Sequence, residues 1–260
     1  MKDYSHYKTD EQRLSARFIS EWGATAREKQ LTPNGPWNFW LILAGRGWGK
    51  TRTGAQDIIR YALLNENVNC AVVTPTFGDL KRVAFGGVSG IMSLIPRACL
   101  IEGRGQGFSS SNQEIRLKNG SKIIGFTATE PDRLRGPQFH RAWCDELAAW
   151  RYPETFDQLL FGLRLGNKPQ CVITTTPKPT EIIRNIMSRK DVHITTGSTF
   201  DNAENLAPSA LAALEERYGG TTLGRQELYA EIVEDIEGAL WSREELEQTR
   251  IPEGHMPEMK

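Results

Sequence analysis

The sequence predicts an α/β protein in which helices flank a mainly parallel β-sheet. Two observations carry this prediction. Short apolar runs alternate with stretches of helical periodicity between residues 39 and 189, a pattern typical of parallel strands joined by helices. A glycine-rich segment, AGRGWGKT at residues 44–51, stands directly between the first of these apolar runs and the helical stretch that follows it.

The first elements follow from periodicity and turn residues. Apolar residues at helical spacing predict a helix over 11–29, and the proline, asparagine and glycine of LTPNGPW predict a loop at 31–37. The next predicted elements are a strand at 39–44, a helix at 50–64, a strand at 70–74 and a weaker helix at 78–94. Residues 113–126 predict a hairpin, because Asn119-Gly120 suits a type I′ turn between two alternating strands.

The remaining elements divide into a sheet part and a helical part. Short strands are predicted at 141–146 and 171–176, followed by a helix at 179–189. Helices at 208–217 and 221–233, around the turn YGGTT, predict a small C-terminal helical lobe. We therefore predict a core with an N-terminal helical segment over 1–200, a helical lid and linker over 201–245, and a disordered tail over 246–260.

Composition excludes several classes of protein. Lysine plus arginine and aspartate plus glutamate both number 32, so any basic surface must be local. No apolar run is long enough to span a bilayer, and the polar N-terminus lacks a secretory signal. Cys70, Cys99, Cys144 and Cys171 are widely spaced, and we interpret them as buried apolar residues in a reducing compartment rather than as a metal site or disulfides.

Residues 44–51 fit the phosphate-binding loop (P-loop) pattern, with Ala44 in the place of its first glycine. Phosphate oxygens need several converging backbone N–H donors, and a chain curls that tightly only where side chains do not obstruct it. Lys50 is predicted to reach the β- and γ-phosphates of ATP, and Thr51 to place its hydroxyl on Mg²⁺. The predicted nucleotide-binding residues of the loop are Gly45, Arg46, Gly47, Trp48, Gly49, Lys50 and Thr51.

Two alternatives accompany this prediction. The segment could be a glycine-rich turn beside a solvated lysine, although the strand before it and the helix after it favour the phosphate-binding loop. The side chain of Trp48 could stack on adenine, but we interpret it as a packing or subunit-facing residue that binds nucleotide only through its backbone.

An acidic pair ends the predicted strand at 141–146. Asp145 is predicted to hold Mg²⁺ through water, and Glu146 to polarise the attacking water. A phosphotransferase that uses an organic acceptor does not require a water-activating glutamate, whereas an ATPase does. The alternative is an acidic pair at the start of a helix.

Two further groups of polar residues are candidates for the same site. Thr174, Thr175 and Thr176 end the next strand and could sense the γ-phosphate, although threonines are common in strands. Arg133 and Arg135 precede the acidic strand on a glycine-containing loop. An arginine meets transition-state charge on a phosphoryl group well, and the alternative is a solvated loop side chain.

The set of GRGWGKT, LRG ahead of CDE, and TTTP resembles the ATPase domain of the large terminase subunit of tailed bacteriophages. The segment DNAENL and the later RYGGTTLGRQELYAEIVEDIEGALW resemble its helical lid and linker, so the resemblance covers roughly residues 25–245. It implies a P-loop NTPase fold of the additional-strand class. It also implies a molecular motor that pumps double-stranded viral DNA through a portal protein into a procapsid, with a small terminase subunit as a further partner.

The resemblance assigns roles residue by residue. It implies that Thr174–Thr176 couple hydrolysis to movement, that Arg46 is a catalytic loop arginine, and that Arg135 is an arginine finger reaching a neighbour's nucleotide. Gln30 could read adenine, although the surrounding REKQ matches the family poorly. The expected cofactors are ATP and Mg²⁺.

The resemblance also implies a setting and a departure. We expect ring assembly, weak in an isolated domain, with no membrane contact, in the host cell cytoplasm during virion assembly. Full terminases carry a nuclease domain, and nothing after residue 245 can supply one, so we expect an excised or truncated ATPase domain that does not cleave DNA.

Two other functions stay open at this point. One is a helicase-like or remodelling ATPase, and the other is a factor that binds nucleotide only to dock on a portal. Lys81, Arg82 and Arg104 are candidates for DNA contact or for ordinary surface charges.

Overall fold

The computed structural model describes residues 9–103, 107–233 and 249. Within these residues one mixed sheet has the strand order β3-β4-β5-β2-β6-β7-β1-β8. The six neighbouring strands β5, β2, β6, β7, β1 and β8 run parallel to one another. Strands β3 and β4 add an antiparallel edge beside β5. The strands are β1 (Phe39–Ala44), β2 (Asn69–Thr74), β3 (Phe108–Ser109), β4 (Glu114–Arg116), β5 (Lys122–Thr127), β6 (Arg141–Asp145), β7 (Gln170–Thr175) and β8 (Val192–Gly197).

The strand order matches the predicted class. Strand β7 lies between β1, which leads into the glycine-rich loop, and β6, which ends in Asp145. An extra strand between these two is the feature that defines the additional-strand P-loop fold. The prediction of a mainly parallel sheet flanked by helices is therefore confirmed.

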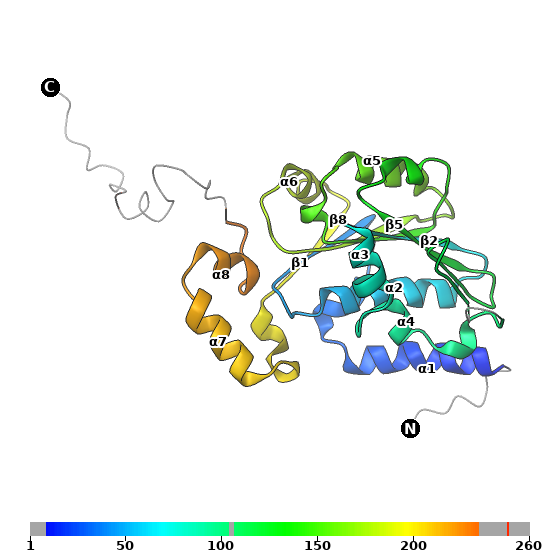
Figure 1. The fold of residues 1–260 in the computed structure, drawn as a ribbon, viewed down its shortest axis with the longest axis horizontal. Helices are drawn as coiled ribbons and strands as arrows, with labels where there is room; N and C mark the ends of the chain where they lie inside the picture. Colours follow the sequence, from blue (N-terminus) through cyan, green and yellow to red (C-terminus); the bar gives the residue numbers. More distant parts are fainter. Residues whose placement is uncertain (1–8, 104–106, 234–248, 250–260) are drawn as a thin grey trace.

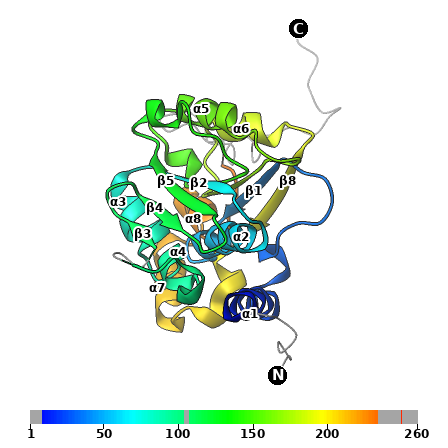
Figure 2. The same cartoon turned by 90° about the vertical axis from the view of Figure 1, so that its right-hand side faces the viewer.

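Helices cover both faces of the sheet (Figure 1). On one face lie α1 (Asp10–Thr25), α2 (Lys50–Leu64) and the short α4 (Ile91–Leu94), and on the other lie α5 (Glu154–Gly162) and α6 (Glu181–Met187). Figure 2 shows the same two layers from the side. Because successive strand residues point to opposite faces, Trp40 and Ile42 enter the core beneath α2, whereas Leu41 and Leu43 enter the core beneath α5 and α6.

The C-terminal lobe stands beside the sheet rather than on it. Helices α7 (Pro208–Tyr218) and α8 (Thr222–Glu227) lie at the left of the molecule in Figure 1. The predicted helix at 208–217 is confirmed, whereas the one predicted at 221–233 ends already at Glu227. The predicted disordered tail over 246–260 lies outside the described residues except for residue 249, and the division of the chain at residue 200 stays a prediction.

The prediction of a weaker helix over 78–94 is wrong. The chain instead forms a single turn, α3 (Phe77–Asp79), a π-helical segment, η2 (Leu80–Phe85), and then α4. The glycines between them explain the break, because the chain folds back on η2 there. A β-carbon on Gly90 would lie 2.6 Å from the Val83 carbonyl oxygen, so only glycine permits this approach.

The predicted hairpin is confirmed, with Ile115 of β4 opposite Ile123 of β5, but its turn is not type I′. That turn requires positive φ at both central residues, and only Gly120 of the predicted pair has one, at 83°. The side chain of Asn119 explains the difference. Its Nδ2 donates to the carbonyls of Ala62 and Asn65, which anchors the hairpin to the end of α2.

Other elements were not predicted, or were predicted with wrong bounds. Strand β8 and helix α5 were not predicted. Strand β8 pairs with β1 over its full length, although its side chains alternate only weakly in burial. The N-terminal helix ends at Thr25, not at residue 29, and a short 3₁₀ turn, η1 (Glu28–Gln30), follows. No helix in the described ranges 9–103 and 107–233 is long and apolar enough to cross a membrane.

Candidate nucleotide-binding site

The glycine-rich loop joins β1 to α2 and depends on left-handed backbone. Gly47 and Gly49 have φ values of 78° and 101°, and Gly49 is the residue that precedes the first turn of α2. Gly45 is required for a different reason. A β-carbon there would lie 2.7 Å from the Thr199 hydroxyl and 2.8 Å from the carbonyl oxygens of Glu227 and Leu228. The loop is thus packed against chain from the C-terminal part of the protein.

Lys50 is buried at the first position of α2. Its Nζ donates to the carbonyl oxygens of Ala44, at 2.9 Å, and Gly45, at 3.2 Å. The same Nζ lies 3.7 Å from Glu146 Oε1. The ammonium group is therefore held at the inner side of the loop, between its first carbonyls and the acidic pair. Thr51 follows it, half-buried in the first turn of the helix.

The acidic pair stands where β6 ends. Asp145 is buried, and its Oδ1 accepts a hydrogen bond of 2.7 Å from the Thr174 hydroxyl. Glu146 has left-handed backbone, with φ of 48° and ψ of 48°, which turns its side chain toward Lys50 and toward β7. Its Oε2 accepts from the Thr176 backbone N–H at 3.3 Å. A non-glycine residue held in this region is uncommon, and such residues cluster at functional sites.

The surroundings of Asp145 destabilise its charged form more than they stabilise it. Burial raises the pKa of Asp145 to about 7, and the neighbouring Glu146 carboxylate acts in the same direction. The Thr174 hydroxyl and the Lys50 ammonium oppose the shift. A buried carboxylate in this state gains free energy from a cation placed beside it.

These residues fit Mg²⁺ bound together with a nucleotide. In the described part of the chain no group of three or more histidine, cysteine, aspartate or glutamate side chains could hold a metal by itself. Mg²⁺ in phosphate sites is commonly held by one or two protein ligands, with phosphates and waters completing its shell. The Asp145 carboxylate and the Thr51 hydroxyl are donors of the kind that such a shell uses.

The three threonines predicted as a set have three different environments. Thr174 is paired in register with Asp145 and bonds to its carboxylate. Thr175 accepts from the Ala148 backbone N–H at 3.1 Å, which fixes the turn after Glu146. Thr176 contributes its backbone N–H to Glu146. The β7 end thus touches both acids, and the coupling role of the threonines stays a prediction.

Trp48 lies in the core beneath α2 and is wholly buried. The guanidinium of Arg27 lies 5.0 Å above its ring, and a β-carbon on Gly197 would collide with the indole. Its side chain therefore packs, as the sequence interpretation favoured. Gln30 is also buried near the loop, where its Nε2 donates to Thr53 Oγ1 at 3.2 Å. Adenine recognition by Gln30 stays a prediction.

The two predicted catalytic arginines are exposed. Arg46 extends from the loop, with its Nε 3.7 Å from Glu227 Oε2. Arg135 follows the 3₁₀ turn η4 (Pro131–Leu134) and pairs with Asp132 of the same turn at 3.2 Å. Among the described contacts, neither arginine touches Lys50 or the acidic pair. Lys81 and Arg82 are exposed on η2, and Arg104 lies outside the described residues.

Several residues around the loop were missed. The Thr199 hydroxyl donates to the Arg46 carbonyl at 2.6 Å, the Asn202 Nδ2 to the Gly47 carbonyl at 2.7 Å, and the Arg46 N–H to the Glu227 carbonyl at 2.7 Å. Arg27 donates to the Trp48 carbonyl and to the Asn202 side chain. These partners are far apart in sequence, so only the segment DNAENL carried a signal, and that signal came from resemblance.

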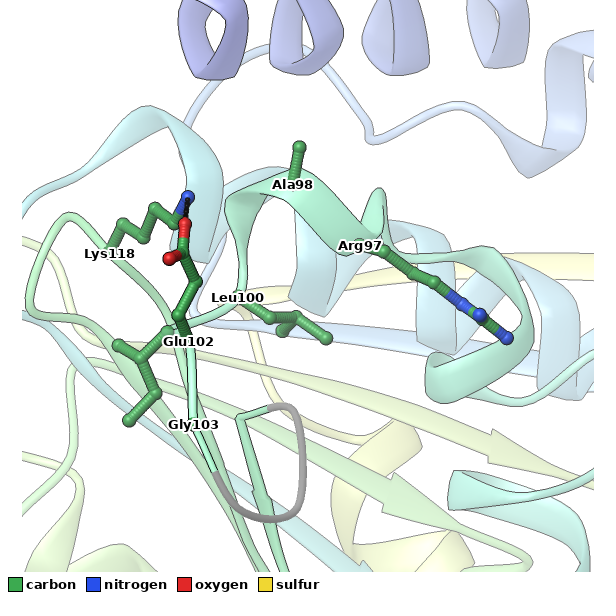
Figure 3. A pocket seen from close by; sticks show the side chains of 7 residues that line it. Arg97, Ala98, Leu100, Glu102, Gly103 and Lys118 are labelled. Atoms are coloured by element: carbon green, nitrogen blue, oxygen red, sulfur yellow. Dashed lines mark hydrogen bonds and ion pairs between the residues drawn. The ribbon is translucent and has the colours of Figure 1, made fainter.

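A hollow of about 500 Å³ is formed by residues other than the glycine-rich loop and the acidic pair. Figure 3 shows its lining, which includes Arg97, Leu100, Glu102 and Lys118. Lys118 Nζ donates to Glu102 Oε1 at 2.9 Å, so the charges of these two side chains neutralise each other. None of the predicted site residues lines this hollow.

Comparison with solved structures shows the fold. The ATPase domain of the Thermus phage P74-26 large terminase superposes with a TM-score of 0.65 at 16% identity, over 84% of this chain and 98% of that one. The large terminase of a second, thermophilic bacteriophage, in complex with ADP, superposes with a TM-score of 0.60 at 12% identity, over 84% of this chain and 53% of that one. The chain therefore spans about half the length of this second terminase.

A family profile supplies the relationship that structure alone does not. No curated protein matches the sequence. The profile described as "Terminase large subunit, T4likevirus-type, N-terminal" matches residues 41–248, which include the loop, the acidic pair, the threonines and the helical lobe. The chain belongs to the large terminase subunit family of the T4likevirus type, of which it represents the N-terminal part.

Proposed function

We propose that this chain binds and hydrolyses ATP with Mg²⁺ as the motor domain of a viral DNA-packaging terminase. The single observation that carries the proposal is the convergence of three charged side chains that follow or end two different strands, β1 and β6. Lys50 after β1 lies 3.7 Å from Glu146 after β6, and Asp145 beside it is buried and bonded to β7. Family membership supports nucleotide as the ligand, as do the ADP and ATP-gamma-S complexes of the thermophilic bacteriophage's large terminase.

Each residue has a chemical task in this proposal. The Lys50 ammonium group donates to the β- and γ-phosphate oxygens in place of the loop carbonyls that it now contacts. The backbone N–H groups of the loop donate to the remaining phosphate oxygens. Glu146 accepts a proton from the attacking water, since it is the half-exposed acid of the pair. Asp145, through water, and Thr51 would hold Mg²⁺, which would neutralise phosphate charge when bound. Gln30 contacts adenine, and Arg46 stabilises the charge on the transferred phosphoryl group.

The larger assembly belongs to the same proposal. The domain acts in a ring of identical subunits that moves double-stranded DNA through a portal protein into a procapsid, in the host cell cytoplasm during virion assembly. A small terminase subunit is the further partner. The position of Arg135 favours the ring proposal. Its guanidinium is exposed, and it pairs with Asp132 rather than with Lys50 or the acidic pair of its own subunit. Thr174–Thr176 support coupling, because they connect β7 to both acids.

Replacement of the loop lysine tests the enzymatic part. Lys50→Ala is expected to abolish phosphate release from ATP while the thermal unfolding curve stays cooperative. Lys29→Ala is the matched control, because Lys29 also donates to a backbone carbonyl, that of Thr196 at 3.1 Å, but remains exposed. Turnover at the unmodified rate in Lys50→Ala would remove the loop from the mechanism. Nucleotide binding without turnover in the unmodified protein would favour a docking factor.

A further inference from the structure

Trp143 is a buried side chain that the proposed mechanism does not use. It lies on β6, two residues before Asp145, and is wholly buried. Its indole Nε1 donates to the Thr174 hydroxyl oxygen at 2.8 Å. Thr174 on β7 is in turn the residue paired in register with Asp145. Since the Thr174 hydroxyl also bonds to Asp145 Oδ1, two hydrogen bonds with Thr174 between them link the indole to the acid assigned to Mg²⁺.

The chemistry of the indole fixes the direction of this chain of hydrogen bonds. An indole N–H can only donate, so the Thr174 oxygen must accept from it. The single hydroxyl proton of Thr174 is then available to one acceptor. Asp145 Oδ1 lies at 2.7 Å and the Cys144 carbonyl at 3.3 Å, so the carboxylate is the better placed. Trp143 thus holds Thr174 as a donor to Asp145.

The helix after the nucleotide loop clamps the indole in place. A β-carbon on Gly54 of α2 would lie 2.2 Å from Trp143 Nε1, so no larger side chain fits at that position. Gly54 stands four residues after Lys50 on the same helix. The indole is consequently wedged between α2 and β6, and a hydrogen bond to the Asp145 carboxylate depends on packing against the loop helix.

We propose that Trp143 is a positioning residue for Mg²⁺, acting through Thr174 on the orientation of the Asp145 carboxylate. The inference rests on the proposed function. A carboxylate that is held by a fixed donor presents its free lone pairs in one direction, toward the metal or toward the water that binds it. Loss of an outer partner of a metal site commonly lowers metal affinity about 10-fold or more. Trp143 itself touches neither nucleotide nor metal in this proposal.

The variant Trp143→Phe tests it, because phenylalanine keeps an aromatic ring and removes the N–H. The readout is equilibrium binding of a fluorescent N-methylanthraniloyl ATP, followed by anisotropy, with Mg²⁺ and with EDTA. We expect the gain in affinity due to Mg²⁺ to fall about 10-fold or more, while affinity in EDTA is unchanged. A defect in packing alone would lower both affinities together.

The matched control is Trp40→Phe. Trp40 is also wholly buried in the same core, and its Nε1 donates to Thr195 Oγ1 at 2.8 Å, on β8 rather than beside Asp145. This variant is expected to keep the full gain from Mg²⁺. An equal loss in both variants, or no loss in Trp143→Phe, would overturn the inference.

A second variant keeps the test valid if Trp143→Phe does not fold. Thr174→Val removes the hydroxyl at nearly constant shape and should by itself lose the same Mg²⁺-dependent gain. Where Trp143→Phe does fold, adding it to Thr174→Val should change that gain no further. A full gain in Thr174→Val, or additive losses in the double variant, would overturn the inference. If the unmodified protein itself shows nucleotide binding without any gain from Mg²⁺, or no binding, the proposed function fails first and the role of Trp143 with it.

Discussion

At the scale of single residues, the proposed site depends on Asp145, whose charged form is disfavoured by its position in the fold. Asp145 is buried beside a second acid, and both effects raise its pKa, to about 7. Lys50 and Thr174 compensate only in part. This imbalance is consistent with the proposed binding of Mg²⁺, since a cation would supply the positive charge that the protein itself does not.

The imbalance predicts how stability depends on pH in the absence of metal. The folded pKa of Asp145 lies above the unfolded value of about 3.9, so the folded state holds this proton more tightly. Its contribution to stability is full below about pH 4 and is lost as pH rises through about 7. Relative to Asp145→Asn, the unmodified protein should lose up to about 1.4 kcal/mol of unfolding free energy per pH unit between these limits.

Urea denaturation in EDTA at several pH values between 5 and 8 measures this difference. Asp145→Asn should become the more stable of the two proteins as pH rises, because an amide does not ionise. Parallel stability curves for the two proteins would show that Asp145 ionises in the fold without cost.

The sequence identified the charged residues of the site but not their support. Lys50, Asp145 and Glu146 each follow or end a strand of a parallel sheet, and the carboxyl ends of such strands meet at one edge. That rule suffices to bring them together. Arg27 and Thr199 could not be predicted in the same way, because their contacts with the loop span 21 and 153 residues and follow no local pattern.

At the scale of elements, the loop is stabilised by the segment after β8. The 3₁₀ segment η6 (Thr199–Asn205) and the end of α8 contact the loop backbone at three places: the Arg46 N–H, the Arg46 carbonyl and the Gly47 carbonyl. The helical lobe is therefore attached to the nucleotide loop directly. A movement of the helical lobe is therefore expected to displace the loop backbone, and the reverse.

This attachment predicts an effect of Thr199, whose side chain is almost wholly buried. Thr199→Val removes the hydroxyl that donates to Arg46 and leaves a carbonyl without this donor. The free energy of unfolding should fall by about 1–3 kcal/mol, and nucleotide affinity should fall with it. Thr199→Ser, which keeps the hydroxyl, should show the smaller loss of both. Equal stability of Thr199→Val and the unmodified protein would mean that the lobe does not support the loop.

Prediction of elements failed where side-chain pattern and backbone requirement disagree. The apolar spacing over 78–94 resembles a helix, but the close approach of Gly90 to the Val83 carbonyl requires the chain to turn back. Strand β8 carries a mixed pattern of buried and exposed side chains, and its pairing with β1 comes from backbone hydrogen bonds that no residue pattern reports. Tertiary contacts decide both cases.

At the scale of the whole molecule, the balance of charge predicts the mode of DNA binding. The net charge is zero, so attraction must come from local groups such as the exposed Lys81 and Arg82 on η2. Binding of duplex DNA should be weak, indifferent to sequence and steeply dependent on salt. Fluorescence anisotropy of a labelled duplex at about 50 and 200 mM salt measures this. Equal affinity at both would contradict phosphate contacts.

The exposed position of Arg135 predicts cooperation between subunits. If it completes the neighbour's site, Arg135→Ala should bind ATP normally, yet hydrolyse it slowly even at high protein concentration. An arginine finger contributes about 10³–10⁵ in rate. Mixing Arg135→Ala, which keeps its loop, with Lys50→Ala, which keeps its arginine, should partly restore turnover where rings form. An inactive mixture of variants that each assemble with unmodified protein would place Arg135 within its own subunit.

The central claim is that Lys50, Asp145 and Glu146 form a site that hydrolyses ATP, and Glu146→Gln tests it most directly. Glutamine keeps the shape of the side chain but cannot accept the proton of the attacking water. The measurement is ATP affinity and phosphate release on the same preparation with Mg²⁺, with the exposed Glu154→Gln as control. Glu146→Gln should bind ATP as the unmodified protein does and lose turnover by about 10²–10⁴. Unimpaired turnover in Glu146→Gln would contradict the assignment of the water-activating base and with it the account of this site.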